Sequence, residues 1–273
     1  MKKALAVIAG FMLLCTASHA FRQEEVRVRS SRMDKDVPVT VITPDVYEEG
    51  KALPVIYLLH GFSDNHTSWA RRGVIGGLSD QYGIIFILPD GGYDSWYFDS
   101  TFTPEYQYET FVSKELVEYV DSHYSTVRDR AGRAITGLSM GGHGALMLGT
   151  RHQETFGSMG SMSGGVDIRP FPDAWGIAQR IGSQEEHPEN WERNTVINMT
   201  HLLKPGAMNI IIDCGTEDFF FEVNCAMHEK LLSEKIPHEF YTRPGQHNWD
   251  YWFNAIRYQV LYFSGCFSKA EVM

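Results

Sequence analysis

Beyond its first 20 residues the sequence lacks any apolar run long enough to span a bilayer. The apolar run at residues 4–15 is also too short, and it follows Lys2 and Lys3. It leads to residues 17–20, Ala-Ser-His-Ala, with small residues at the two positions that a signal peptidase reads. We therefore predict that residues 1–20 are a secretory signal peptide, that cleavage follows the last of them, and that the mature protein is periplasmic or secreted.

Cysteine is scarce, and its spacing matches no metal site. Leu14 precedes Cys15 where a lipoprotein signal requires a small residue, which argues against a lipid anchor. The mature chain keeps Cys214, Cys225 and Cys266, and an odd count is no disulfide framework. The first two of these could pair, but three buried free thiols is the favoured interpretation. Neither C-x-x-C nor H-E-x-x-H occurs, so the sequence predicts no metal site.

Positive charge is also in deficit, with 24 Lys and Arg residues against 34 Asp and Glu residues. Removing the two lysines of the leader leaves 22 basic residues and a net charge of −12. This balance argues against nucleic acid and anionic membrane surfaces as partners. Internal repeats and low-complexity segments are absent too. Length and an apolar content of 43% fit one large globular domain over residues 21–273.

Predicted strands alternate with predicted helices along the chain. Two amino-terminal strands, 24–33 and 37–43, suggest an antiparallel start to a sheet, and the apolar run 54–59 is typical of a strand buried on both faces. The alternation that follows predicts βαβ units, and therefore an α/β fold with a mostly parallel central sheet flanked by helices. The remaining predicted strands are 84–88, 131–136, 156–163, 208–213 and 238–243, and the predicted helices are 108–124, 140–152, 219–233 and 251–263.

Residues 166–206 interrupt this alternation. The segment holds four prolines, two tryptophans and a short charged run. We interpret it as a small insertion that lies over the carboxyl edge of the sheet, where ligands of open α/β sheets bind. Because loops of this length in compact domains are usually functional or disordered, a lid-like role is favoured over a surface excursion without a role.

The segment Ala134–Ala145 contains Gly137-Leu138-Ser139-Met140-Gly141, a G-x-S-x-G pattern between a short apolar strand and a helix. This context is typical of a nucleophile elbow. Gly137 and Gly141 lie two residues on either side of Ser139, where a Cβ would clash. Ser139 would then stand exposed at the start of a helix, where free N–H groups favour developing negative charge.

A serine nucleophile needs a base and an acid that orients the base, in the chain order Ser, Asp or Glu, His on this fold. His247 lies in a Gly- and Pro-containing loop after the last predicted strand and is the candidate base. Asp218 lies in the loop after strand 208–213 and is the candidate acid. His143, on the helix after Ser139, is interpreted as packing or polar support. Asp213, Glu217 and Glu222 remain alternatives for the acid.

Two preorganised N–H donors are needed to stabilise a tetrahedral oxyanion. Met140, the residue after the nucleophile, should supply one donor, and Phe62, in the loop after strand 54–59, should supply the other. Gly61 would permit close approach of the backbone to substrate. Trp96 and Tyr97 lie in a loop after a predicted strand and are candidates for substrate contact. Further aromatic candidates for the pocket are Trp69, Trp191, Trp249 and Trp252.

With these motifs in place, the chain resembles the esterase D family of α/β-hydrolases over residues 37–263. That family includes S-formylglutathione hydrolases, tributyrin-type esterases, mycolyltransferases, and the acetylxylan and feruloyl esterases of carbohydrate esterase family one. The resemblance implies Ser139, Asp218 and His247 as the triad, and it implies neither a metal nor an organic cofactor. The motifs that carry it are Leu58–Phe62, Leu88–Gly92, Gly137–Gly142, Asp213–Asp218 and Gly245–Trp249.

The resulting functional hypothesis is an exported serine carboxylesterase that acts on acetyl, feruloyl or other short acyl esters, on plant polysaccharide fragments. Glutathione thioesters, the cytosolic substrates of some members, would be out of reach of an exported protein. An acyltransferase of the mycolyltransferase type on the same scaffold is the first alternative, and a non-catalytic carbohydrate-binding protein is the second. The sequence does not define the oligomeric state.

Overall fold

The computed structural model describes residues 20–271 of the chain. The predicted signal peptide lies outside the described residues, apart from Ala20 at its predicted cleavage site. Within residues 20–271, no helix has both the length and the apolar character needed to cross a membrane.

One eight-stranded sheet forms the centre of the fold, in the order β1-β2-β4-β3-β5-β6-β7-β8. The first two strands pair antiparallel with each other, and β2 pairs antiparallel with β4, whereas every later pairing is parallel. The predicted antiparallel start and mostly parallel sheet are therefore confirmed. The strands are β1 Arg22–Ser30, β2 Lys35–Thr43, β3 Val55–Leu59, β4 Ile85–Pro89, β5 Arg133–Gly137, β6 Ser158–Met162, β7 Asn209–Gly215 and β8 Glu239–Arg243.

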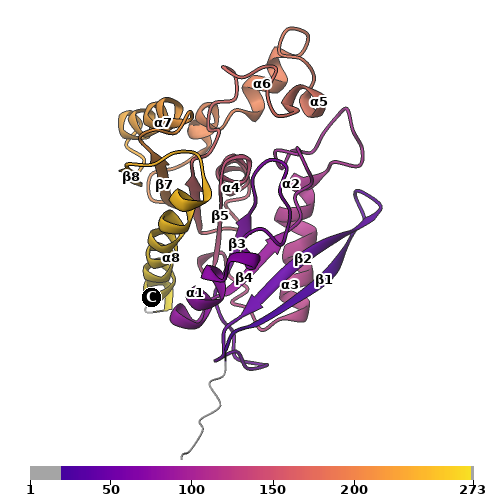
Figure 1. Ribbon diagram of the computed structural model, residues 1–273, viewed down its shortest axis with the longest axis vertical. Helices are drawn as coiled ribbons and strands as arrows, with labels where there is room; N and C mark the ends of the chain where they lie inside the picture. Colours follow the sequence, from indigo (N-terminus) through magenta and orange to yellow (C-terminus); the bar gives the residue numbers. More distant parts are fainter. Residues whose placement is uncertain (1–19, 272–273) are drawn as a thin grey trace, which may run out of the picture.

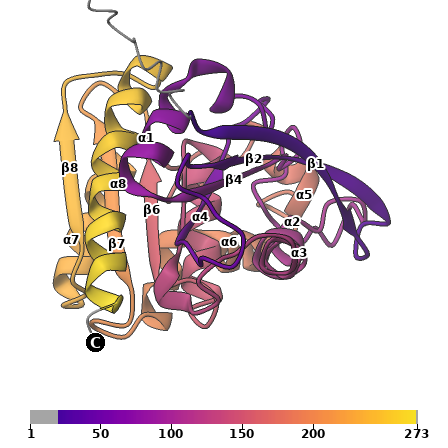
Figure 2. The same ribbon diagram turned by 90° about the horizontal axis from the view of Figure 1, so that it is seen from below.

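Helices cover both faces of the sheet, so that the domain has three layers (Figures 1 and 2). One hydrophobic cluster joins α1 and α8 to one face, and a second joins α3, α4 and α7 to the other. The helix α1 was not among the predicted helices, because Gly76 and Gly77 interrupt its apolar pattern. The helices are α1 Val74–Tyr82, α3 Leu116–His123, α4 Met140–Arg151, α7 Phe221–Ser233 and α8 Trp249–Glu271, with short turns at Ala70–Arg72 and Arg130–Gly132.

The predicted helix 108–124 is composite. It begins as α2 (Tyr108–Thr110), passes through a π-helical stretch at Phe111–Glu115, and continues as α3. The predicted helix 251–263 is longer than expected at both ends: α8 begins at Trp249, two residues after the candidate base His247, and continues to Glu271.

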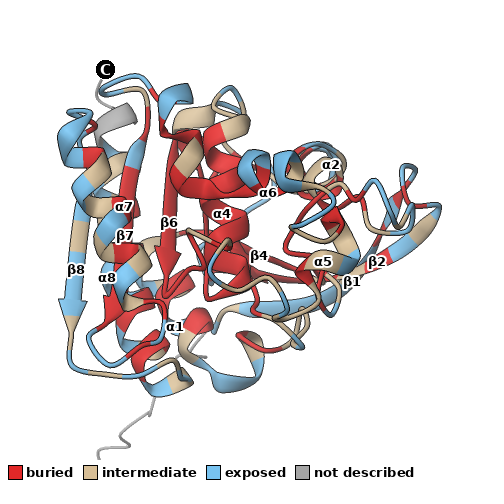
Figure 3. Cartoon of the chain, turned by 90° about the horizontal axis from the view of Figure 1, so that it is seen from above, coloured by how far each residue is buried: buried red, intermediate tan, exposed pale blue. Residues whose placement is uncertain are grey.

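Burial follows the sheet (Figure 3). Every residue of β3, β4, β5 and β6 is buried, as expected for central parallel strands that are covered on both faces. The edge strands β1 and β8 are largely exposed. The carboxyl ends of the central strands therefore lie at the edge of a rigid, fully packed core. Such a core is a suitable support for a reactive site.

The predicted insertion folds into short helices above the end of the sheet (Figure 1). It is pinned to the body by Arg180, which forms an ion pair of 2.7 Å with Asp94 and stacks 3.7 Å from the ring of Tyr106. Both charged side chains of this pair are about nine-tenths buried. Its helices are α5 Ile177–Ile181, α6 Pro188–Asn194 and a 3₁₀ helix at Val196–Leu202.

Candidate active site

Ser139 lies at a sharp turn between the end of β5 and the first residue of α4. Its backbone has φ 55° and ψ −117°, a conformation that non-glycine residues rarely adopt. A Cβ on Gly137 would lie 2.6 Å from the Gly141 backbone, and a Cβ on Gly141 would lie 2.6 Å from the carbonyl oxygen of His60. The prediction that both flanking positions require glycine is confirmed.

Ser139, His247 and Asp218 form one continuous chain of hydrogen bonds. The Oγ atom of Ser139 lies 2.9 Å from Nε2 of His247, and Nδ1 of His247 lies 2.8 Å and 3.0 Å from the two carboxylate oxygens of Asp218. Ser139 comes from the elbow, Asp218 from the loop after β7 and His247 from the loop after β8. An imidazole held in this way can accept the serine proton, and the carboxylate stabilises the resulting cation.

Asp218 is held rigidly in this position. Its carboxylate is inaccessible to solvent, and Oδ1 accepts a hydrogen bond of 2.8 Å from the backbone N–H of Phe220. The alternative acids lie elsewhere: Asp213 is buried against Arg243 and Tyr251, and Glu217 and Glu222 are exposed. Of the four acids considered, Asp218 is the one that contacts His247.

The loop after β3 places Phe62 at the cleft, and Met140 is the first residue of α4, directly after Ser139. Among the described turns and loops, no backbone carbonyl accepts a hydrogen bond from the N–H of Phe62. Gly61 lies close beneath Ser139, because a Cβ at this glycine would be 3.4 Å from the Cβ of Ser139 and 2.6 Å from Leu138. The two predicted oxyanion donors therefore belong to segments that meet at the serine.

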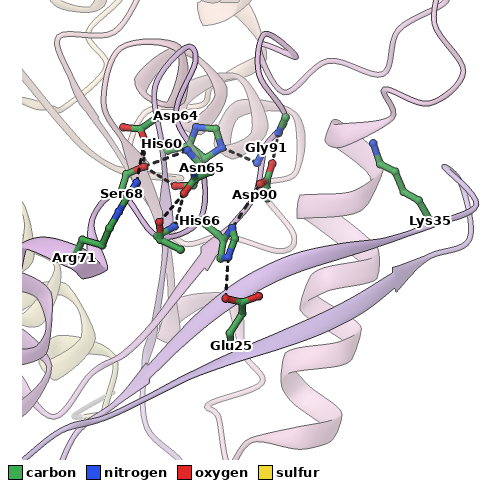
Figure 4. A network of polar contacts seen from close by, with 12 residues as sticks. Glu25, Lys35, His60, Asp64, Asn65, His66, Ser68, Arg71, Asp90 and Gly91 are labelled. Carbon is green, nitrogen blue, oxygen red and sulfur yellow. Dashed lines mark hydrogen bonds and ion pairs between the residues drawn. The ribbon is translucent and has the colours of Figure 1, made fainter.

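His60 anchors this loop from below (Figure 4). Its Nε2 accepts a hydrogen bond of 2.8 Å from the N–H of Gly91, and its Nδ1 lies 2.7 Å from the carbonyl oxygen of Gly61. These contacts require the neutral ring with its proton on Nδ1. Burial lowers the pKa of His60, which favours that neutral form. His60 thus has a structural role.

The rest of the loop is fixed by a polar network (Figure 4). The hydroxyl of Ser68 donates to Asp64 and accepts a hydrogen bond of 3.1 Å from the N–H of Asn65. His66 lies between two carboxylates, with Nε2 3.3 Å from Glu25 and Nδ1 3.5 Å from Asp90. These contacts join the loop to β1 and to the loop after β4.

A cleft of about 490 Å³ opens over Ser139 and His247. Its aromatic walls are Trp175 from the insertion, Phe219 from the acid loop, and Trp249 and Trp252 from α8. The insertion therefore reaches the site. The rings of Trp175 and Phe219 are stacked, with centroids 5.6 Å apart and an interplanar angle of 19°. Trp249 and Trp252 were among the sequence candidates. Trp175 and Phe219 were missed, although Phe219 directly follows the candidate acid.

Trp96 and Tyr97 require a correction, because they do not line this cleft. Their side chains are 1% and 0% exposed, and both residues have positive φ (52° and 61°), which turns the rings into the core. Tyr97 donates a hydrogen bond of 3.1 Å to the carbonyl oxygen of His60, and Trp96 Nε1 donates one of 3.1 Å to the carbonyl oxygen of Trp175. The two rings support cleft segments from beneath. Trp69 and Trp191 are buried as well.

His143 is a buried support residue, in agreement with its sequence interpretation. Its Nε2 donates a hydrogen bond of 2.8 Å to the carbonyl oxygen of Asn194, and its ring packs edge-on against Trp96 and Phe98. Burial lowers the pKa of His143 to about 4, so the ring is neutral near neutral pH.

Within the described residues, no group of three or more His, Cys, Asp or Glu side chains is placed to hold a metal ion. Cys214 and Cys225 are not joined by a disulfide. Cys214 is buried, but Cys225 and Cys266 are partly exposed, which corrects the expectation of three buried thiols. A second hollow, of about 530 Å³, lies near Tyr47 and Ser122, at the amino ends of the strands and away from Ser139.

Comparison with known proteins gives a consistent result. The sequence profile of the Esterase family, described as "Putative esterase", matches residues 30–263. The acetyl esterase of Caldicellulosiruptor saccharolyticus is 28% identical over 235 residues, which cover 80% of this chain and 85% of that protein. The S-formylglutathione hydrolase of Bos taurus is 26% identical over 242 residues, covering 79% and 83%. The structure of a ferulic acid esterase superimposes with a TM-score of 0.80 at 26% identity, covering 92% and 100%.

The extent of the match decides the assignment. The profile begins at the last residue of β1 and ends within α8, so it includes the elbow and the loops that carry Asp218 and His247. The superposition likewise covers nearly the whole chain and confirms the predicted α/β-hydrolase fold. The resemblance inferred from the motifs is confirmed as well. This chain belongs to the esterase family, within the esterase D group of α/β-hydrolases, and is a serine carboxylic-ester hydrolase.

Proposed function

We propose that the protein hydrolyses acyl esters through an acyl-enzyme on Ser139, with His247 as general base and acid and Asp218 as the residue that orients it. The observation that carries this proposal is the unbroken hydrogen-bond chain from Ser139 Oγ through His247 to the buried carboxylate of Asp218. A serine hydroxyl is a poor nucleophile unless its proton is accepted during attack, and this chain provides the acceptor.

The steps follow from the geometry. Ser139 Oγ attacks the ester carbonyl carbon while its proton passes to Nε2 of His247. The N–H groups of Phe62 and Met140 donate to the oxyanion that forms. Collapse of the tetrahedral intermediate expels the alcohol, which takes the proton from Nε2. Water then attacks the acyl-enzyme by the same route, with His247 again accepting and returning a proton.

The walls of the cleft support substrates whose acyl or alcohol part is planar or apolar, and Gly61 lets the backbone approach them closely. Aromatic side chains give sugars and aromatic acyl groups large contact surfaces at low entropic cost. We propose acetyl or feruloyl esters on plant polysaccharide fragments as substrates, in line with the names of the acetyl esterase and ferulic acid esterase relatives. The signal-peptide pattern in residues 1–20 supports export of the protein. An exported enzyme would encounter such polymers outside the cell.

The insertion, residues 166–206, is proposed to close one side of the site. Trp175 contributes to the wall, and its peptide carbonyl is held by Trp96. The backbone of Trp175 has φ 48°, a strained conformation that places the ring against Phe219. The insertion would therefore act as a positioned cover whose aromatic face meets the substrate.

The decisive experiment measures acetate and ferulate separately after incubation with a feruloylated, acetylated arabinoxylan hydrolysate. Wild type is compared with Ser139→Ala, and both are checked with p-nitrophenyl butyrate. Release of either acid by wild type and its loss in the variant is the expected result. Unchanged hydrolysis by Ser139→Ala would refute the nucleophile. Cleavage of the butyrate without release of either acid would refute the polysaccharide substrate, and preferential transfer to an added sugar would identify an acyltransferase.

A further inference from the structure

Asp213 is a buried carboxylate in the site region that the proposed mechanism does not use. It lies near the end of β7, and none of its surface is exposed. Two side chains donate hydrogen bonds to it, the guanidinium of Arg243 to Oδ2 and the hydroxyl of Tyr251 to Oδ1. A buried charge is costly unless it is paired and hydrogen bonded, and these two donors meet that requirement.

The positions of the two donors relative to His247 are informative. Arg243 ends β8 and lies four residues before His247, while Tyr251 lies in the first turn of α8, four residues after it. A single carboxylate therefore holds both ends of the nine-residue segment 243–251, and His247 is the central residue of that segment.

The backbone ties the same segment to the loop that carries the acid. The N–H of Thr216 donates 2.9 Å to the carbonyl oxygen of Arg243, and the N–H of Glu217 donates 3.0 Å to that of Gly245. A Cβ on Gly215 would lie 2.3 Å from the Gly245 carbonyl oxygen, so the two loops are in close contact. A shift of segment 243–251 would therefore change its register against the loop that carries the acid.

We propose that Asp213 is a positioning residue for catalysis. Through Arg243 and Tyr251 its carboxylate fixes segment 243–251, and so sets the hydrogen bonds that His247 makes with Ser139 and Asp218. This inference rests on the proposed roles of Ser139, His247 and Asp218. A carboxylate that served stability alone would leave the geometry of His247 unchanged when it was replaced.

The chain offers a matched control for stability. Asp121 forms an ion pair with Arg133, whose side chain is also largely buried, and accepts a hydrogen bond of 2.7 Å from Thr126. This pair lies at the amino end of β5, opposite to the end that carries Ser139. Asp121→Asn removes a paired carboxylate charge that is 18% exposed, without touching any segment of the site.

The experiment compares Asp213→Asn, Tyr251→Phe and Asp121→Asn with wild type and Ser139→Ala. For each protein it measures the melting temperature, kcat and KM for p-nitrophenyl butyrate, and the downfield proton resonance of His247 Nδ1–H. The asparagine keeps the size of the side chain but has only one acceptor oxygen. It therefore cannot accept hydrogen bonds from both Arg243 and Tyr251 in the way that the carboxylate does. Tyr251→Phe removes one hydroxyl and provides a milder test if Asp213→Asn does not fold.

We expect Asp213→Asn to lower kcat by about 10- to 100-fold with little change in KM, since small misplacements of a catalytic group have effects of this size. Tyr251→Phe should lower kcat less, and both variants should shift or broaden the Nδ1 resonance. Asp121→Asn should lower the melting temperature and leave kcat and the resonance unchanged. Folded Asp213→Asn or Tyr251→Phe proteins with wild-type kcat and resonance would overturn the inference.

Failure of the proposed function would give a different set of results from failure of the positioning role. Ser139→Ala would then retain turnover, whereas the resonance would still report whether Asp213 positions His247. An unchanged resonance in Asp213→Asn, together with a Ser139→Ala protein that lacks turnover, would overturn the positioning role and leave the proposed function intact.

Discussion

Phe219 lies against the ring of His247, with ring centroids 4.2 Å apart and an interplanar angle of 36°. Half of the surface of this phenylalanine (52%) is exposed, so the ring is accessible from the solvent side of the site. The ring of Phe219 also stacks on Trp175. Because the ring follows Asp218 directly in sequence, its position is fixed by the same turn that places the acid.

This arrangement makes Phe219 a determinant of substrate preference. We expect Phe219→Ala to raise KM for a feruloyl ester by about fivefold, because an aromatic contact contributes on the order of 1 kcal/mol beyond its buried area. KM for a small acetyl ester should change less. Steady-state kinetics with both esters tests this. Phe102→Ala, which removes an exposed ring that packs on His187 in the insertion, serves as control. Equal losses on both esters would contradict the prediction.

The proposed role of Asp218 can be separated from that of its neighbour. Asp218→Asn should lower kcat by about 10⁴-fold with KM little changed, because the amide stabilises the wrong tautomer of His247. Glu217→Gln changes an exposed carboxylate in the same loop and should leave kcat unaltered. Initial rates with p-nitrophenyl butyrate measure both variants. A kcat for Asp218→Asn close to that of wild type would show that the acid lies elsewhere.

Two helical glycines should respond oppositely to the same substitution. In Gly141→Ala the new Cβ would lie 2.6 Å from the backbone oxygens of Leu59 and His60, so we expect loss of soluble folded protein or of activity. Gly77→Ala, in α1, meets no atom within 4 Å and should stabilise the protein by about 1 kcal/mol. Thermal unfolding of the two variants checks this. A fully active, stable Gly141→Ala protein would contradict the close contact between the elbow and β3.

The stability of the protein should decrease with acid partly because of His143. Burial lowers the pKa of His143 from 6.5 to about 4. The unfolded chain therefore binds a proton that the folded chain does not, and stability is lost as the pH falls through this window. His143→Gln keeps a donor for the Asn194 carbonyl but does not titrate. We expect it to remove about 3 kcal/mol of the acid-dependent loss.

Denaturant unfolding of His143→Gln and wild type at a series of pH values between about 7 and 4 measures this difference. His123→Gln, on the protein surface, is the control for the exchange of a histidine for a glutamine outside the core. A variant at residue 143 whose stability falls with acid as steeply as that of wild type would contradict the prediction.

Features encoded within a few residues were predictable from the sequence. The G-x-S-x-G elbow around Ser139 and the order of Asp218 and His247 follow from local turn chemistry and from the alternation of strands and helices. The burial of Trp96 and Tyr97 was not predictable, because it depends on two successive residues with positive φ, a conformation that aromatic residues seldom adopt. The helix α1 was missed because Gly76 and Gly77 lower its helix propensity and tertiary packing outweighs that cost.

Trp175 illustrates another limit. The insertion was expected to lie over the site, but which of its residues reaches the cleft depends on distant contacts. The ion pair between Arg180 and Asp94 and the hydrogen bond from Trp96 set the position of this one tryptophan. Interactions between residues roughly 80 positions apart in the chain leave no periodic signal in the sequence.

The place of α8 in the fold also has a consequence for how the chain folds during synthesis. This helix is the last described element, and Ile256, Val260 and Phe263 cover the sheet face that includes Ile56 and Phe86. Until the ribosome has released these residues, only α1 covers that face, and the segment with His247 has no helix to anchor it. Nascent chains would therefore expose part of an aggregation-prone surface until α8 has emerged, and esterase activity would appear only after α8 docks.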